Sequence, residues 1–249
     1  MTLLSDPKLK CLHTFKYKDF TPLLPYQCKT KTLKIMMTIV KIVVILLLVL
    51  GFIIMFMKHD ERSAPHDAFN QIAHDASHLH RYQSYDHYPY SYHLGKVADI
   101  AKKYWSFYGD EPRLHEALWM AAWFHDTIED VPSYTYNDVF QYAKKFFGEN
   151  EPVYPRMVAE IVYACTTEKG KNRKERANDK YYQGIRDTGY APFIKACDRL
   201  ANMTYANQTQ SKMNQAYRKE LPDFLQKIDN PDNPIPPELK DALCQFLED

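Results

Sequence analysis

The sequence predicts an all-α protein, a compact helical domain with an N-terminal transmembrane helix. Apolar residues recur at spacings of three and four through most of the chain after residue 58, which is the period of amphipathic helices. The 249 residues include only 7 glycines, which argues against a many-turned all-β fold or Gly-rich phosphate loops. Near the N-terminus, one apolar run is long enough to span a bilayer.

The N-terminal run defines two segments. Residues 1–34 contain seven lysines and several prolines without a helical or strand period, so we expect a flexible basic tail. From residue 35 to residue 57 the chain is apolar except at Thr38 and Lys41. This length matches the roughly 20 residues of a bilayer span. A transmembrane helix over 35–57 is therefore favoured over a cleaved signal peptide, because charged residues follow the run where small ones would be needed.

Beyond the apolar run, helices follow one another, and Pro or Gly marks many of their ends. They are expected over residues 68–81, 93–108, 113–125, 137–147, 153–165, 192–207 and 212–228, with a last short helix after the turn-rich break at 229–237. Pro112 lies at the start of the third helix, and proline is favoured in the first turn of a helix. The polar, strongly basic stretch 166–182 interrupts the period. Together they predict one all-α domain over 62–249.

Composition excludes several classes of protein. The formal net charge is +1, so no overall field attracts a nucleic acid, and none is expected as a partner. The 5 cysteines are scattered and odd in number, with no CxxC pair. This argues against a disulfide framework and against a cysteine-based zinc site.

One of four His-Asp dipeptides stands out by its surroundings. The dipeptides lie at 59–60, 66–67, 74–75 and 125–126. Only His125-Asp126 ends a strongly apolar helix, AAWFHD, and runs directly into Thr-Ile-Glu-Asp. An imidazole and three carboxylates thus gather at the edge of a hydrophobic body. Neutral imidazole with carboxylate oxygens suits a divalent metal such as Mn, Fe or Zn.

Two further segments offer ligands of the same kind. His93 begins a helix after the aromatic lead-in YPYSY. Asp198 lies in the apolar helix IKACDRLANM, where a charge is costly unless it is bound or paired. Lys195 and Asn202 lie three and four residues from Asp198, so they share one edge of that helix.

These blocks, YSYHLGKVADIA, AAWFHDTIEDV and FIKACDRLANM, resemble the HD superfamily of metal-dependent phosphohydrolases. They are most similar to the hydrolase domain of RelA/SpoT-type alarmone enzymes and their small stand-alone relatives. The blocks occur in the order H, HD, D over roughly residues 66–215. The resemblance implies a compact HD-type helical domain and an enzyme that hydrolyses nucleotide phosphates.

The resemblance also implies a role for each matching residue. His93, His125, Asp126 and Asp198 would hold one divalent metal, by similarity Mn(II). Glu129 and Asp130 match the acidic pair that orients and deprotonates the attacking water, a catalytic role. Lys195 and Asn202 match positions that line the substrate pocket.

Two positions depart from the family pattern. The family carries an Arg-Lys pair shortly before its Pro-Tyr-x-x-His element to grip the guanine nucleotide, whereas the corresponding positions here fall at Tyr85, Asp86 or His87. The Arg-Thr that usually follows the DRLxNM block is replaced by Thr204-Tyr205. Both departures affect recognition of the base and leave the metal-binding pattern intact.

The basic stretch 169–176, KGKNRKER, is a second candidate for binding substrate phosphates. Arg173 and Arg176 are its best candidates, and a solvated loop is the alternative. His66, His74, His78 and His80 offer imidazoles for a second metal site, but no acidic block accompanies them. Surface or cleft positions are therefore favoured for these four histidines.

The leading hypothesis is a guanosine 3′,5′-bis(diphosphate) 3′-pyrophosphohydrolase-like enzyme. The alternatives are an HD-type 5′-nucleotidase acting on mononucleotides and a membrane-tethered sensor that binds a nucleotide without turnover. The intact Glu129-Asp130 pair argues against the sensor, which would not need a base. A single-pass membrane protein is expected, and both orientations stay open. The positive-inside rule places the basic tail in the cytoplasm, which would send the domain after residue 58 to the other side of the membrane. A nucleotide hydrolase, however, would be expected in the cytoplasm. Translation from Met57 would instead give a soluble cytoplasmic domain.

Overall fold

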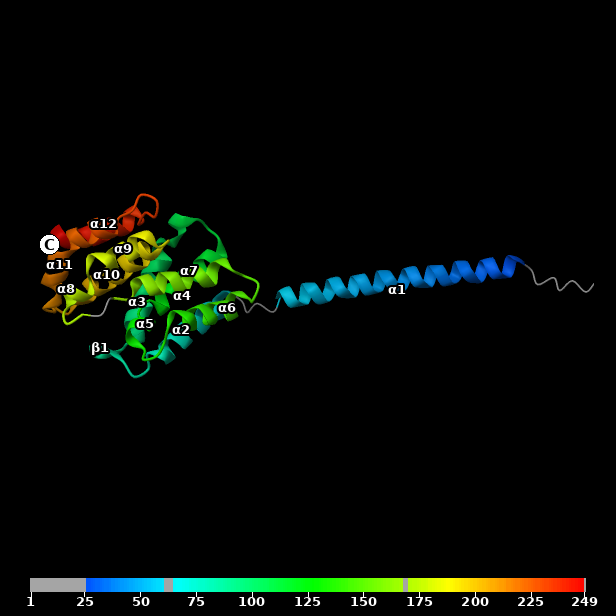
Figure 1. Ribbon diagram of the computed structural model, residues 1–249, viewed down its shortest axis with the longest axis horizontal. Coiled ribbons are helices and arrows are strands. Elements are labelled where there is room, and N and C mark those ends of the chain that lie inside the picture. Colours follow the sequence, from blue (N-terminus) through cyan, green and yellow to red (C-terminus); the bar gives the residue numbers. More distant parts are fainter. Residues whose placement is uncertain (1–25, 61–64, 168–169, 249) are drawn as a thin grey trace, which may run out of the picture. The chain divides into compact units, whose positions relative to one another are not determined.

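The computed structural model describes residues 26–60, 65–167 and 170–248. The chain divides into two compact units, Met1–Glu61 and Arg62–Asp249 (Figure 1). Each unit has its own internal contacts and is described by itself.

The first unit contains one long helix, α1 (Tyr26–Asp60). Its segment Leu33–Phe52 has 20 residues with a mean hydropathy of 2.9 and is long and apolar enough to cross a membrane. The helix begins at Tyr26, inside the stretch expected to be a flexible tail, because helical hydrogen bonding continues into the lysine-bearing residues before the apolar run. Residues 1–25 of that expected tail lie outside the described residues. The expected helix is confirmed, and its crossing of a membrane stays a prediction.

The second unit is built from helices, and the predicted all-α fold class is confirmed (Figure 1). Its helices are α2 (Pro65–Leu79), α3 (Ser91–Tyr104), α4 (Pro112–Phe124), α5 (Thr127–Asp130), α6 (Tyr136–Phe147), α7 (Val153–Cys165), α8 (Arg173–Arg176), α9 (Asp179–Asp187), α10 (Ala191–Gln208), α11 (Met213–Ile228) and α12 (Pro237–Glu248). A 3-10 helix, η1 (Trp105–Tyr108), follows α3, and a short hairpin of β1 (Ser84–Tyr85) and β2 (Tyr88–Pro89) precedes it.

Several elements differ from the sequence-based expectation, among them α8 and α9 in the basic stretch, the 3-10 helix η1 and the hairpin β1–β2. Helix α9 forms inside the polar stretch 166–182 and extends beyond it, because Asn178 caps its N-terminus by accepting a hydrogen bond from Tyr181 N at 3.0 Å. Tyr181 and Ile185, four residues apart, supply its buried face. The hairpin β1–β2 has strands of two residues, which is too short for an alternating pattern to reveal.

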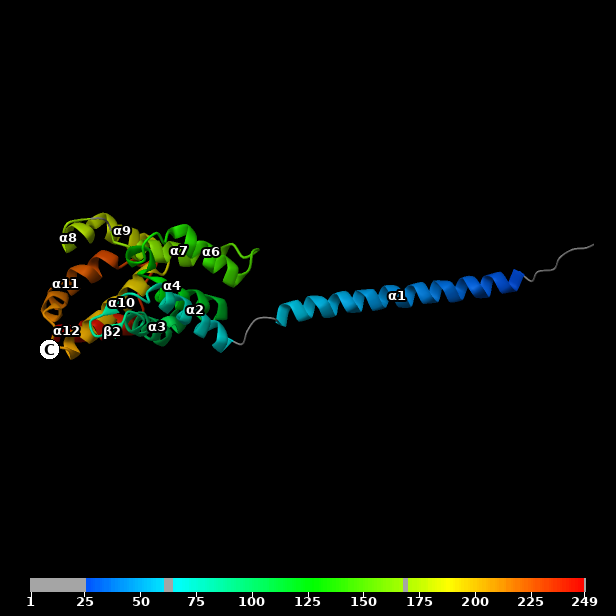
Figure 2. The same ribbon diagram turned by 90° about the horizontal axis from the view of Figure 1, so that it is seen from below.

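Helix α10 lies inside the helical bundle of the second unit, with α11 and α12 packed beside it (Figures 1 and 2). Twelve of its residues are buried, so it has almost no solvent-facing side. Helix α3 packs against both α4 and α10, and α7 packs against α4 and α10 as well. The three segments that carry the candidate ligands therefore meet within one hydrophobic core.

Two valines in α7 test the packing of this core. Val158 is fully buried, whereas Val153 in the same helix is 61% exposed. Val158→Ala is expected to lower the free energy of unfolding by about 2 kcal/mol, because it removes buried methyl groups and leaves a cavity. Val153→Ala is the matched control and should change stability by less than about 0.5 kcal/mol. Urea unfolding of the detergent-solubilised chain, followed by near-UV circular dichroism, measures both, and equal effects would contradict this packing.

Candidate metal centre

Three helical segments position the candidate ligands. His93 lies in the first turn of α3, and His125 directly follows the last residue of α4. Asp126 stands between α4 and α5, and Asp198 lies in the middle of α10. Because α3 packs against both α4 and α10, residues far apart in sequence meet at one place.

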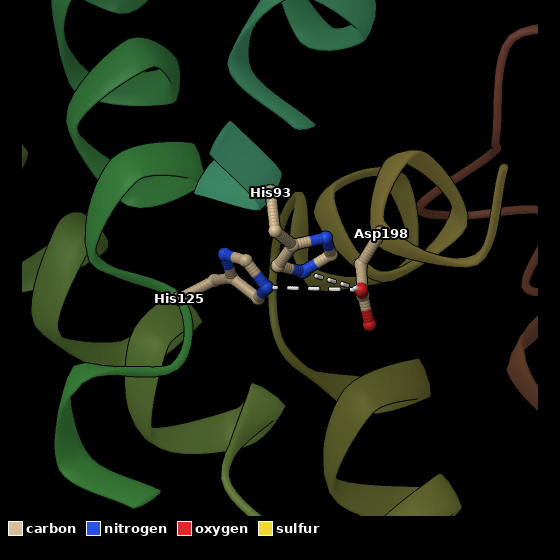
Figure 3. Close-up of side chains that lie close together, drawn as sticks. All are labelled: His93, His125 and Asp198. Carbon is tan, nitrogen blue, oxygen red and sulfur yellow. Dashed lines mark ion pairs between the residues drawn. The ribbon is translucent and has the colours of Figure 1, made fainter. Parts of the chain in front are cut away.

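The imidazoles and the Asp198 carboxylate face one another in the core (Figure 3). His93 Nε2 lies 3.3 Å from Asp198 Oδ1, and His125 Nε2 lies 3.8 Å from the same oxygen. One ligand atom from each of the three residues falls within 4.8 Å of the others, and all three residues are buried. This spacing allows a single metal ion to contact all three.

Asp126 adds a second carboxylate to the cluster. Its Oδ2 lies 3.0 Å from His125 Nε2 and 3.6 Å from His93 Nε2. The structure therefore brings together all four residues that the sequence singles out as ligands. Their joint binding of a metal stays a prediction.

The hydrogen bonding of His125 fits a metal ligand. Its Nδ1 lies 2.8 Å from the carbonyl oxygen of Ala122 and can donate to it, which in a neutral ring leaves the Nε2 lone pair free for a metal. His125 Nε2 is buried and has no hydrogen bond among the described residues, since its short contact with Asp126 is not aligned as one. Buried polar atoms without a hydrogen-bond partner are rare. A divalent cation between the imidazoles and carboxylates would satisfy this atom.

The charges in the cluster depend strongly on one another. Burial opposes the positive form of His125, but Asp126 and Asp198 outweigh it and raise the pKa of His125 to about 10. Burial likewise opposes the carboxylate form of Asp198, yet Lys195 and the two imidazoles hold the pKa of Asp198 well below its usual value. The carboxylates are therefore ionised and ready to bind a cation.

The two predicted catalytic acids have different surroundings. Asp130 is half-buried, and burial together with the nearby Asp126 charge raises its pKa. Glu129 is exposed, and its carboxylate accepts hydrogen bonds from Thr167 N at 3.0 Å and Thr167 Oγ1 at 2.7 Å. Both belong to α5. The pKa of Asp130 is raised in part by the charge of Asp126, one of the candidate ligands.

A cavity of about 170 Å³, here called the cationic cavity, opens beside Asp198. Its lining includes Glu129, Thr167, Arg176, Lys195, Asp198, Arg199 and Asn202, with Tyr181, Tyr182, Tyr217 and Phe224 among its other residues. Three of the four predicted substrate-binding residues thus line one cavity. The fourth, Arg173, begins the short helix α8, but its side chain lies outside the described residues, as does residue 169 at the start of the basic stretch.

Lys195 and Asn202 also hold the Asp198 carboxylate. Lys195 Nζ lies 2.9 Å from Asp198 Oδ2, and Asn202 Nδ2 donates to Asp198 Oδ1 at 2.5 Å. Burial opposes the charge of Lys195, but Asp198 raises its pKa well above the usual value. Lys195 therefore stays positive at the wall of the cationic cavity.

Two residues that support the centre, Tyr90 and His80, were not predicted to do so, and His80 is buried where a surface or cleft position was expected. The Tyr90 hydroxyl donates to Asp126 Oδ2 at 2.7 Å. His80 is buried, and its ring stacks on Tyr90 with centroids 5.0 Å apart. Ile72, Ala76 and His80 are four residues apart, so they share one face of a helix. This spacing could have indicated that His80 is buried with the two apolar residues.

His74 and His78, by contrast, are exposed. The part of the chain that the structure describes holds no second group of metal-ligating side chains. The expected surface position is therefore found for these two histidines, and the side chain of His66 lies outside the described residues.

Helices α3, α4 and α10 thus bring His93, His125-Asp126 and Asp198 together, as expected for the H, HD, D order of the sequence blocks. One similar solved structure belongs to a protein described as a metazoan ortholog of SpoT that hydrolyzes ppGpp and plays a role in starvation responses. It matches with a TM-score of 0.51 and 22% sequence identity, over 73% of this chain and 94% of that chain. No family model and no curated protein sequence matches the chain. At this identity the likeness establishes the fold.

Metal retention tests the assignment of ligands. His125→Ala or Asp198→Ala is expected to abolish binding of a divalent metal, because each removes a buried ligand atom. Glu129→Gln is the control and should retain the metal, since Glu129 is bound to Thr167. Metal content after gel filtration, measured by mass spectrometry, distinguishes these variants. Full metal content in either ligand variant would rule out the assigned centre.

Proton release on metal binding tests the charge state of the cluster. Because the pKa of His125 is raised to about 10, this imidazole carries a proton at neutral pH when no metal is bound. A liganding imidazole is neutral, so we expect His125 to release about one proton per metal at pH 7 and affinity to rise with pH below that pKa. Calorimetry in two buffers with different ionisation enthalpies gives the number of protons released per metal bound. Metal binding without proton release would contradict the raised pKa.

Proposed function

We propose that this chain is a metal-dependent phosphohydrolase that cleaves a phosphate or pyrophosphate bond of a nucleotide. The observation that carries the proposal is the buried group of His93, His125 and Asp198, with Asp126 beside it and the cationic cavity next to it. Two acids that are suited to accept a proton, Glu129 and Asp130, follow directly in the chain. The expected cofactor is one divalent metal, and Mn(II) is the choice that the family resemblance favours.

The reaction needs a positive environment for the phosphate and a base for the water. A divalent metal at the four ligands would supply Lewis acidity toward the phosphoryl oxygens and lower the pKa of a water. Lys195 and Arg176 would neutralise charge on the phosphate that enters the cationic cavity. Asn202 would orient the substrate beside Asp198.

Asp130 is the acid to which we assign the proton of the attacking water, while Glu129 lines the cationic cavity. The raised pKa of Asp130 makes it a stronger base than an ordinary aspartate. As the water oxygen bonds to phosphorus, the bond from phosphorus to the leaving oxygen breaks. Asp130 takes the proton that the water loses, and the leaving oxygen takes up a proton from solvent. Glu129 would orient the water once its carboxylate leaves Thr167.

The preferred substrate is guanosine 3′,5′-bis(diphosphate), with loss of the 3′-pyrophosphate. The similar solved structure belongs to a protein described as hydrolysing ppGpp, and the sequence blocks resemble the same family. A mononucleotide is the second candidate, because the cationic cavity has a volume of only about 170 Å³. The membrane would be the second partner, through residues 35–57 of α1.

Conservative variants of the two acids test the catalytic step. Asp130→Asn and Glu129→Gln are each expected to lower kcat by about 100- to 10,000-fold, the range for loss of a general base. Both should keep the metal. The acidic limb of the wild-type pH profile should disappear with Asp130→Asn, because activity is lost as pH falls through the raised pKa of Asp130. Full activity in both variants would exclude them as the base.

A nucleotide panel tests the function itself. The Mn(II)-loaded chain in detergent is incubated with guanosine 3′,5′-bis(diphosphate), its 5′-triphosphate form and nucleoside monophosphates, and released phosphate or pyrophosphate is measured. Release from the alarmones alone supports the first candidate, and release from monophosphates alone supports the second. The absence of turnover on every nucleotide, with metal bound, would refute the enzyme proposal. The Asp198→Ala variant provides the inactive control.

A further inference from the structure

Two cavities border the candidate metal centre. The cationic cavity is lined by Asp198, and a larger one of about 510 Å³, here called the aromatic cavity, is lined by His93. His93 Nε2 and Asp198 Oδ1 are only 3.3 Å apart, so both cavities reach the same cluster of ligands. The wall of the aromatic cavity includes Tyr85, Tyr92, Tyr104, Tyr205, Lys96 and Lys103.

Helix α10 forms a ridge between the two cavities. Lys195, Asp198 and Asn202 line the cationic cavity, whereas Ala201 and Tyr205 line the aromatic one. These residues belong to adjacent faces of the same helix. A substrate that occupies both cavities would therefore cross α10 near Asp198 and Asn202.

Tyr85 lies across that passage. Its ring stacks on His93, with centroids 4.8 Å apart and planes 14° from parallel. Its hydroxyl donates a hydrogen bond to Asn202 Oδ1 at 2.8 Å. Tyr85 lines the aromatic cavity and Asn202 lines the cationic cavity, so this hydrogen bond joins the wall of one cavity to the wall of the other.

The hairpin that carries Tyr85 is fastened to α10. Tyr205 OH donates to Asp86 Oδ2 at 2.7 Å, and the rings of Tyr85 and Tyr205 meet edge to face at 4.8 Å. Asp86 has a φ of 55°, a left-handed conformation that Asp tolerates better than most residues in a tight turn. The hairpin therefore presents Tyr85 from a short turn with contacts to both α3 and α10.

We propose that Tyr85 is a specificity-determining residue that separates the aromatic cavity from the cationic cavity. A phosphate group can enter the cationic cavity with Tyr85 in place. A nucleoside attached to that phosphate can extend into the aromatic cavity only after the Tyr85–Asn202 hydrogen bond and the stack on His93 are broken. The inference rests on the proposed phosphohydrolase function, because it takes the cationic cavity as the phosphate site.

Binding of two matched diphosphonates tests the role of Tyr85 without turnover. Methylenediphosphonate and guanosine 5′-(α,β-methylene)diphosphate differ by the guanosine, and neither is cleaved at the bridging carbon. Calorimetry on the full, Mn(II)-loaded chain in detergent gives both dissociation constants. Tyr85→Phe keeps the ring and removes the hydrogen bond, so affinity for the guanosine compound relative to methylenediphosphonate should rise about 3- to 10-fold. Tyr85→Ala should raise this ratio further.

Tyr92→Phe is the matched control. Tyr92 lines the same aromatic cavity, and no hydrogen bond of its hydroxyl occurs within the described residues. Its substitution should leave the ratio of affinities unchanged. The ratio is the informative quantity, because any disturbance of Asn202 acts on both compounds.

If the two Tyr85 variants change the affinities for methylenediphosphonate and for the guanosine compound by the same factor, the proposal is overturned. Tyr85 would then only hold Asn202 in position. Failure of methylenediphosphonate to bind any metal-loaded protein would overturn both this proposal and the phosphate site beneath it. If the ratio rises as expected while no nucleotide is hydrolysed, the role of Tyr85 stands and the proposed hydrolysis fails.

Discussion

The buried carboxylate of Asp198 is the constraint on which the rest of the domain depends. An ionised carboxylate inside a helical core is costly unless other groups compensate for its lost hydration. Here four side chains lie against it: His93 and His125 on one oxygen, Lys195 on the other, and Asn202 as a hydrogen-bond donor. These residues come from α3, from the end of α4 and from α10 itself, so compensating one charge ties three helices together.

The same contacts prepare the centre for a cation. Three of the four candidate ligands are oriented by a second group: His125 by the carbonyl of Ala122, Asp126 by Tyr90, and Asp198 by Asn202. Such outer contacts fix the direction of a ligand's lone pair and keep it in place when a metal binds or leaves. The cationic cavity, lined by Asp198 and Lys195, offers an approach for a phosphate to this centre.

Much of this arrangement could be predicted from the sequence, because the necessary signals are local. The charged Asp198 in an apolar helix, the His125-Asp126 pair at a helix end and the helical period each require only a few neighbouring residues. The difference between Glu129 and Asp130 was not predictable in this way. It depends on Thr167, which is 38 residues from Glu129 and lies close to it because α7 packs against α5.

The position of Tyr85 between the aromatic cavity and the cationic cavity could not be predicted from the sequence, for a similar reason. Tyr85 and Asn202 are 117 positions apart, and the hairpin between α2 and α3 is too short to produce a strand pattern. The sequence showed that the Arg-Lys pair of the family it resembles is replaced at Tyr85, Asp86 or His87. The consequence of this replacement depended on where the hairpin packs. In the fold, Tyr85 lies on a metal-ligand candidate and separates two cavities, so the change concerns the shape of the site as well as its charge.

We propose that the two buried imidazoles, His93 and His125, bind one divalent ion. Electron spin-echo spectroscopy of the Mn(II)-loaded chain, with ¹⁵N introduced at histidine, detects such bonds directly. Hyperfine coupling from two directly bound imidazole nitrogens is expected, with one coupling lost in His93→Ala. Manganese bound without any coupling to histidine nitrogen would exclude this centre.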